Sequence, residues 1–120
     1  MSRNHPPSGL KIKQLAEGTG MQAERGMQVA IHFRCFLNRG EEIENTYDSN
    51  EPYRFQIGKR QAIAGVEYGV EGMQVGERRE LIVSPHLAYG DQSVNQIPPN
   101  AVLRFEIELI DVKPGIQPDF

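Results

Sequence analysis

The clearest structural signal in the chain is the stretch MQVAIHFRCFL, residues 27–37. Apolar and polar side chains alternate along most of it, and a period of two residues is that of a β-strand. A strand with one apolar and one polar face is typical of an antiparallel sheet that buries one side. The expected core face holds Val29, Ile31, Phe33, Cys35 and Leu37, and the expected solvent face holds Gln28, His32 and Arg34.

The same alternation recurs elsewhere in the chain. Residues 101–112, AVLRFEIELIDV, put apolar side chains on one face and charged side chains on the other, and residues 78–83 continue the pattern. Residues 9–15 and 52–58 are shorter candidates. Glycine-containing turns separate these segments, so the sequence predicts a twisted antiparallel sheet.

One segment predicts a helix, RQAIAGVEYGVEGM at residues 60–73. Ile63, Val66, Val70 and Met73 recur at spacings of three and four and form one apolar face. Glycines within the segment weaken it by about 1 kcal/mol each relative to alanine, so this helix needs a sheet to pack against. The sequence therefore predicts an α+β fold, with one short helix across the concave face of the sheet.

Length and composition are those of one globular domain. The chain has 120 residues, and we expect a single domain at residues 10–113 between tails at 1–9 and 114–120. The net charge is −3, without a basic run, which argues against a nucleic-acid or anionic-membrane partner. No apolar stretch predicts a secretion signal or a membrane span. The single cysteine, Cys35, excludes an intrachain disulfide, and we expect a cytoplasmic monomer.

The sequence has no pattern typical of metal, phosphate or nucleophilic chemistry. His5, His32 and His86 are not at metal-ligand spacing, and the motifs HExxH, GxSxG and GxxxxGK do not occur. Alternation buries Cys35, which predicts an inert core thiol, and a solvated turn explains the acidic run GEEIEN. We expect no metal and no cofactor, so any catalysis proceeds without them.

Two segments carry the most specific motifs. Residues 58–90 contain I-x-G-x-E-x-G-V-x-x-M and S-P-x-x-A-Y-G, and residues 97–112 begin with I-P-P-N-A-x-L-x-F. Residues 29–59 add a histidine–aromatic pair, G-x-x-x-(D/E)-x-(S/T) and P-aromatic-x-F. Over residues 10–112 the chain resembles the FKBP family of peptidyl-prolyl cis–trans isomerases, proteins that bind macrolides such as rapamycin.

The resemblance implies a five- or six-stranded antiparallel sheet wrapped around one short helix, with a pocket between the helix and the sheet. It implies that this pocket accelerates rotation about Xaa–Pro amides, so proline-containing peptides and macrolides are the expected partners. The twisted amide has a less polar carbonyl than the planar amide, so an apolar pocket with one or two donors suffices. By resemblance the catalytic residues are Tyr89, Glu44, Phe33 and Phe105, and the substrate-binding residues are Ile43, Tyr53, Ala62, Ile63, Val66 and Ile97.

Within this set, the hydroxyl of Tyr89 and the backbone N–H of Ile63 match the family's donors to ligand carbonyls. Phe33 and Phe105 also fit plain core positions, and Tyr53 also fits a plain strand aromatic. Tyr89 lies in a turn and is harder to explain as core, because a buried phenol needs a partner.

Three positions depart from the family's pattern. Val66 replaces a tryptophan on the helix, Ile43 replaces a phenylalanine, and Glu44 replaces an aspartate. The smaller Val66 leaves a looser pocket floor, so we expect an isomerase with weakened activity and an altered preference for the residue before proline. The alternatives are a non-catalytic module that binds proline-containing or apolar peptides, and a chaperone-type isomerase. The latter usually carries an inserted domain near residues 93–99, and this sequence has none there.

Overall fold

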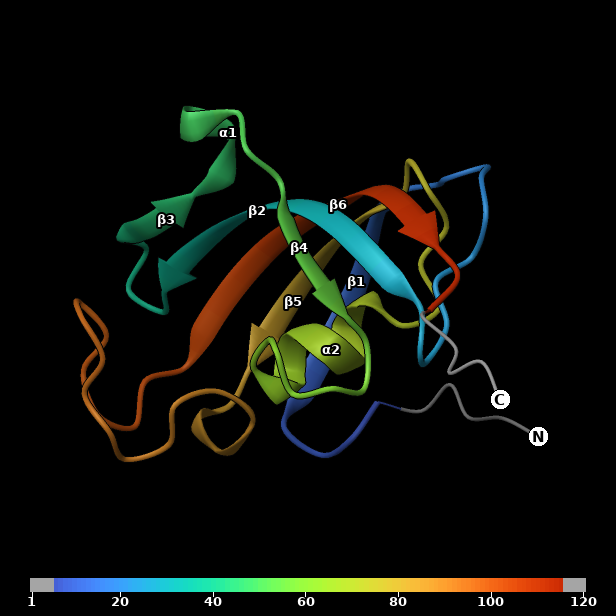
Figure 1. Ribbon diagram of the computed structural model, residues 1–120. Coiled ribbons are helices and arrows are strands. Elements are labelled where there is room, and N and C mark those ends of the chain that lie inside the picture. The colour runs from blue at the N-terminus through green and yellow to red at the C-terminus, as the bar shows by residue number, and fades with distance from the viewer. Residues whose placement is uncertain (1–5, 116–120) are drawn as a thin grey trace.

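The computed structural model describes residues 6–115. A six-stranded sheet with purely antiparallel pairing is the main element of this range (Figure 1). This confirms the predicted antiparallel sheet with a short helix packed against it. The elements are β1 (Leu10–Ala16), β2 (Gln28–Leu37), β3 (Glu42–Asn45), α1 (Thr46–Ser49), β4 (Tyr53–Gln56), α2 (Ala64–Val70), β5 (Arg78–Val83), a 3₁₀ turn (Pro85–Leu87) and β6 (Leu103–Lys113).

The sheet has the strand order β1-β5-β6-β2-β3, and β4 also pairs with β2. Both β3 and β4 therefore lie along the same edge of β2. β4 pairs with residues 28–31 of β2, and β3 pairs with residues 34–36. In Figure 1 the long strands β2 and β6 arch over α2. No helix within residues 6–115 is long and apolar enough to cross a membrane.

The inner faces of the strands form the core, as the alternation predicts. The core-face residues of β2 are buried, and so are Leu103, Phe105, Ile107 and Leu109 of β6. They pack in one cluster with Val66 and Val70 of α2 and with Leu81 and Val83 of β5. Burial of this apolar surface supplies most of the stabilisation of the domain.

The outer face of β2 is not the solvent face that the alternation predicts. His32 is only 8% exposed because the ring of Tyr47 stacks on it, with 4.5 Å between ring centroids. Phe36 is buried beneath the guanidinium groups of Arg34 and Arg104, which lie 5.0 and 4.1 Å from its ring centroid. The prediction of a wet face was wrong for His32, because the α1 segment folds over it.

α2 is shorter than the predicted helix at residues 60–73. It spans Ala64–Val70. Arg60 has a φ of 59° and Gly72 a φ of 91°, and these left-handed conformations do not continue a right-handed helix. Met73 is fully buried, but from the turn after the helix.

Two glycines bring α2 against β5. A Cβ added to Gly65 would lie 2.4 Å from Cγ1 of Val83, and one added to Gly69 would lie 2.3 Å from Cδ1 of Leu81. Neither distance is possible for a side chain. These glycines therefore lower intrinsic helix stability, as the sequence predicts, and in exchange permit close packing on the sheet.

A buried ion pair fixes the C-terminal end of α2. Arg79 Nη1 donates to the carbonyl oxygens of Gly69 and Glu71, at 3.0 and 3.3 Å, and Arg79 Nε donates to Glu77 at 2.7 Å. Glu77 is 3% exposed and also accepts from the Gln14 side chain and the Gln74 backbone. Burial raises the pKa of Glu77, but these hydrogen bonds and the Arg79 charge outweigh it, so that the pKa is lowered overall.

The predicted tails lie largely outside the described range. Residues 1–5 and 116–120 are not described. Within the range, the ring Nε2 of His86 donates to the backbone carbonyl of Ser8 at 3.0 Å. This bond connects the chain just before β1 to the 3₁₀ turn, and the domain boundary at residue 10 stays a prediction.

Candidate active site

Three aromatic rings from three strands meet on the inner face of the sheet. Phe33 of β2 lies 5.8 Å from Phe105 of β6 and 6.0 Å from Tyr53 of β4, measured between ring centroids. The contact with Tyr53 is edge-on, an arrangement that aromatic quadrupoles favour. Phe33 and Phe105 are buried and belong to the main core cluster, so they serve both as core and as one wall of the predicted site.

Tyr53 also fastens the loop that leads into α2. Its hydroxyl donates to the backbone carbonyl of Gln61 at 2.7 Å, and the Gln61 side chain accepts from the Gln56 backbone at 2.9 Å. Burial raises the pKa of Tyr53, and the negative charges of Glu44 and Glu67 raise it further. The phenol therefore stays protonated at neutral pH and acts as a tie between β4 and the loop.

That loop ends at Ile63, whose carbonyl begins the hydrogen bonding of α2. The Ile63 carbonyl accepts from the backbone N–H groups of Val66 and Glu67. Its own N–H has no acceptor among the described residues, as is common at a helix N-terminus. Ile63 and Ala62 are half-buried against the core cluster, and Val66 is buried within it. An unpaired donor thus sits beside an apolar surface.

Tyr89 and Ile97 lie at the two ends of the loop after the 3₁₀ turn, and they differ in solvent exposure. Ile97 is 8% exposed and belongs to the core cluster, whereas Tyr89 is 37% exposed. The loop is closed at its base by the Asn100 N–H, which donates to the Gly90 carbonyl at 2.8 Å. Val94 and Ile97 exchange backbone bonds at 3.0 and 2.7 Å within it. The loop is therefore ordered by its own hydrogen bonds.

The Tyr89 hydroxyl has no hydrogen-bond partner within residues 6–115. Burial raises the pKa of Tyr89, and the negative forms of Cys35, Glu44 and Tyr53 raise it further. The phenol is therefore a protonated donor at neutral pH.

β3 brings Ile43 and Glu44 to the same rim. Ile43 is half-buried against the core cluster, and Glu44 is exposed opposite Cys35 of β2. Burial, with a smaller contribution from Glu44, raises the pKa of Cys35 to about 12. The thiol is buried, as alternation predicts, and it is protonated and unreactive at neutral pH. Glu44 forms no ion pair among the described residues.

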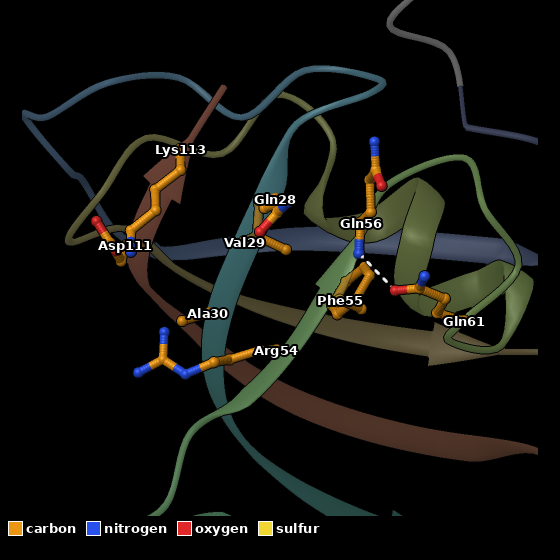
Figure 2. A pocket seen from close by; sticks show the side chains of 9 residues that line it. All are labelled: Gln28, Val29, Ala30, Arg54, Phe55, Gln56, Gln61, Asp111 and Lys113. Carbon is orange, nitrogen blue, oxygen red and sulfur yellow. Dashed lines mark hydrogen bonds between the residues drawn. The ribbon is translucent and has the colours of Figure 1, made fainter. Parts of the chain in front are cut away.

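A cavity of about 340 Å³ lies elsewhere, on the outer face of the sheet (Figure 2). Figure 2 shows Arg54 and Gln56 reaching it from β4, and Asp111 and Lys113 from β6, with Ala30 of β2 between them. None of the predicted site residues lines this cavity, whose lining is mostly polar and includes Gln61 of the loop before α2. Its lining is Gln28, Val29, Ala30, Arg54, Phe55, Gln56, Gln61, Asp111 and Lys113.

The family model of FKBP-type peptidyl-prolyl cis-trans isomerase matches residues 19–110. The chain belongs to this family. It is 41% identical over 111 residues to FK506-binding protein 1A of Neurospora crassa, covering 91% of this chain and 92% of that protein. It is also 41% identical over 110 residues to the FK506-binding protein of Streptomyces anulatus, covering 89% of each. The crystal structure of AtFKBP13 superposes with a TM-score of 0.81 at 32% identity, covering 88% of this chain and 94% of that one.

Membership identifies the chain as a peptidyl-prolyl isomerase, and the site is consistent with that chemistry. Rotation about an Xaa–Pro amide makes and breaks no covalent bond, so neither a nucleophile nor a metal is required. Within the described range no group of three or more histidine, cysteine or acidic residues is placed to hold a metal ion. The predicted site residues instead include buried apolar side chains, and the Ile63 N–H and the Tyr89 hydroxyl have no partner among residues 6–115.

Thr46, the first residue of α1, makes hydrogen bonds that the sequence did not predict. Its hydroxyl accepts from the Phe33 N–H at 2.8 Å, donates to the Phe33 carbonyl at 3.3 Å and lies 2.9 Å from His32 Nδ1. The adjacent Tyr47 donates to Glu108 at 2.6 Å. Burial, then this bond, raises the pKa of Tyr47 to about 12. The one sequence signal was the Ser/Thr position that closes the G-x-x-x-(D/E)-x-(S/T) motif.

Proposed function

We propose that this isomerase binds an Xaa–Pro segment over Phe33, Phe105 and Val66, with substrate carbonyls accepting from the Ile63 N–H and the Tyr89 hydroxyl. The supporting observation is that Phe33, Phe105 and Val66 belong to one apolar cluster, and that Ile63, which packs against this cluster, has a backbone N–H without an acceptor among the described residues. The barrier to rotation is about 18–20 kcal/mol. Because the twisted amide is less polar than the planar one, an apolar surface stabilises the transition state more than the ground state.

We also propose that catalysis is weakened by the small side chain at Val66. Val66 is buried and contributes little area against which a prolyl ring packs. An isomerisation assay on a series of Xaa–Pro peptides tests both proposals. We expect acceleration above the uncatalysed rate, with the greatest turnover for peptides that have a large apolar residue before proline. Rates equal to the uncatalysed rate for every peptide contradict the catalytic proposal.

The Tyr89 hydroxyl is tested separately by Tyr89→Phe, which keeps the ring. Loss of one hydrogen bond is expected to lower kcat/KM about five- to tenfold. An unchanged kcat/KM removes Tyr89 from the proposal. If the protein instead binds prolyl peptides without speeding cis/trans exchange, NMR exchange spectroscopy will detect shifted resonances and unchanged exchange rates. That result favours a non-catalytic binding module.

Macrolide binding is a further part of the proposal, because the curated relatives are named for FK506 binding. Titration with rapamycin tests it. We expect Val66→Trp to tighten binding by adding aromatic area at the pocket floor. Weaker or unchanged binding by this variant contradicts that role for residue 66.

We propose that the domain acts as a monomer in the cytoplasm, on proline-containing segments of other proteins. Among its exposed large apolar side chains, Leu15, Met21 and Ile110 lie outside the proposed site. Sedimentation at micromolar concentration tests the monomeric state, and fluorescence microscopy of tagged protein tests the cytoplasmic location. Concentration-dependent dimerisation or a membrane-bound signal contradicts them.

A further inference from the structure

The edge of β2 has a gap between its two partner strands. β4 pairs with β2 up to Ile31, and β3 pairs with it from Arg34. Neither strand pairs with His32 or Phe33 on this edge. The backbone N–H and carbonyl of a buried strand residue need partners, and an unmet group costs about 1–3 kcal/mol.

The hydroxyl of Thr46 fills this gap. Asn45 is opposite Arg34 in the ladder, so Thr46 would be the next residue opposite Phe33. At Thr46 the chain leaves the ladder and enters α1, so the Thr46 side chain, and not its backbone, bonds to the Phe33 backbone. The hydroxyl both accepts from the Phe33 N–H and donates to the Phe33 carbonyl, at 2.8 and 3.3 Å.

The third bond of the hydroxyl goes to His32. A hydroxyl has one proton and two acceptor positions. With its proton on the Phe33 carbonyl, one acceptor position takes the Phe33 N–H and the other takes His32 Nδ1–H, at 2.9 Å. Every hydrogen-bonding capacity of the Thr46 hydroxyl is then used.

This arrangement connects to the proposed site on both sides. Phe33 is the central ring of the aromatic cluster. Ile43 and Glu44 lie on β3, immediately before Thr46. α1 itself buries none of its residues, and apart from the stacking of Tyr47 on His32, hydrogen bonds hold this segment to β2.

We propose that Thr46 is a positioning residue of the isomerase, whose hydroxyl sets the placement of Ile43 and Glu44 relative to Phe33. This rests on the proposed function of the same site. The hydroxyl touches no substrate and acts through the residues that it holds. Its loss moves the rim of the pocket while leaving the core intact.

The test compares Thr46→Val, which keeps the shape and removes the hydroxyl, with Thr46→Ser, which keeps the hydroxyl. At a temperature where circular dichroism shows all three proteins folded, we expect kcat/KM to fall about tenfold in Thr46→Val. Thr46→Ser should stay within about twofold of wild type. The wild-type rate alone tests the proposed function, and the ratio between the variants tests the positioning role.

Two NMR measurements are independent of catalysis. Hydrogen exchange of the Phe33 amide should accelerate at least about tenfold in Thr46→Val, while the Ile107 amide on β6 keeps its wild-type protection. The methyl resonances of Ile43 should shift in Thr46→Val and not in Thr46→Ser. A general loss of protection with unchanged Ile43 resonances and unchanged kcat/KM means that Thr46 only stabilises the fold, and it overturns the proposal.

Equal losses in the Ser and Val variants also overturn the proposal, because the hydroxyl would then not be the active group. Should Thr46→Val fail to fold, Thr46→Cys provides a graded case, since a thiol is a weaker hydrogen-bonding group. For Thr46→Cys, kcat/KM is expected to lie below the values of wild type and Thr46→Ser, by less than about tenfold. The Phe33 amide is expected to exchange faster than in wild type and Thr46→Ser, by less than about tenfold. Wild-type values in Thr46→Cys count against the proposal.

Discussion

The two structures that flank the proposed pocket are held by different forces. α2 packs on β5 through glycine contacts closer than any side chain permits, and its end is fixed by a buried ion pair. On the β3–α1 side, β3 pairs with only three residues of β2, and α1, which buries none of its residues, is attached through the hydroxyls of Thr46 and Tyr47 and the stacking of Tyr47 on His32. Burial is non-directional and distributed over many contacts, whereas a few hydrogen bonds depend on geometry. We therefore expect the β3–α1 side to open locally before the α2 side does.

The largest effect on the α2 side is expected from Arg79→Met. It leaves the Glu77 carboxylate buried without its cation and removes the donors to the Gly69 and Glu71 carbonyls. Unpairing a buried charge typically costs about 3–5 kcal/mol of unfolding free energy. Urea denaturation at pH 7 measures it, with Arg78→Met as the exposed control on the same strand. A loss similar to that of the control would show that the ion pair does not hold this side.

The next effect is expected from Gly69→Ala. The new methyl group would overlap Leu81, forcing α2 away from β5, and overpacking of this kind costs about 1–3 kcal/mol. Tyr68→Ala, on the exposed side of the same helix, is the control and should change stability little. If Gly69→Ala stabilises the protein through helix propensity, the close contact is not what limits α2.

A smaller effect depends on pH. The pKa of Glu77 is lowered in the folded protein, so its contribution to stability is fully present above the unfolded-state pKa of about 4.3 and is lost as pH falls through the folded-state value. The stability difference between wild type and Glu77→Gln should therefore narrow as pH is lowered below about 4. Urea titrations between pH 7 and pH 3 measure this. If the difference in unfolding free energy between wild type and Glu77→Gln stays constant with pH, the variant loses stability through packing and not through charge.

Local opening on the β3–α1 side can be detected at Cys35. Its thiol is buried opposite Glu44 of β3, with a pKa of about 12, so it reacts only after the chain opens. At pH 8 and low urea, we expect the labelling rate to be nearly independent of urea, because opening β3–α1 exposes little surface. A labelling rate that rises with urea as steeply as the equilibrium constant of unfolding means that Cys35 is exposed only by global unfolding. That result would contradict the expectation that the β3–α1 side opens before the α2 side.

The smallest effect is expected at the turn between β2 and β3. Arg39 and Glu41 form an ion pair 2.7 Å long, with side chains 74% and 58% exposed. Arg39→Ala should change the unfolding free energy by no more than about 0.5 kcal/mol in 0.1 M salt. A larger loss would assign real stabilisation to surface charge on the β3 side.

The strands and the core were predictable because their signal is local. Alternation within β2, β5 and β6 decides which side chains face inward, and Phe105 and Leu81 followed it. The limits of α2 were not predictable from periodicity, since the left-handed conformation of Arg60 is set by the loop around it. The sequence predicts that Gly69 lowers the intrinsic stability of the helix. That Gly69 also permits close packing depends on the position of Leu81, which the sequence does not show.

The sequence predicts the site as a set of residues and not as a set of contacts, and the roles of these residues stay predictions. Of the residues that the motif resemblance names, all but Tyr89 and Glu44 belong to one apolar cluster or pack against it. The burial of His32 and the bonds of Thr46 could not be foreseen, because they arise where β3 and β4 leave β2 uncovered. No pattern marked the outer cavity either, since it depends on small Ala30 lying between Arg54 and Asp111.

The shared edge of β2 has a consequence for where this fold can accept added residues. β3 and β4 are each anchored to β2 on their own, so the connection between them, residues 46–52, begins and ends on one strand. Added residues after Ser49 would lengthen an excursion whose anchors stay in place, and the entropic cost of such growth rises only with the logarithm of length. The fold can therefore accept connections of different length between β3 and β4 while both strands stay paired with β2.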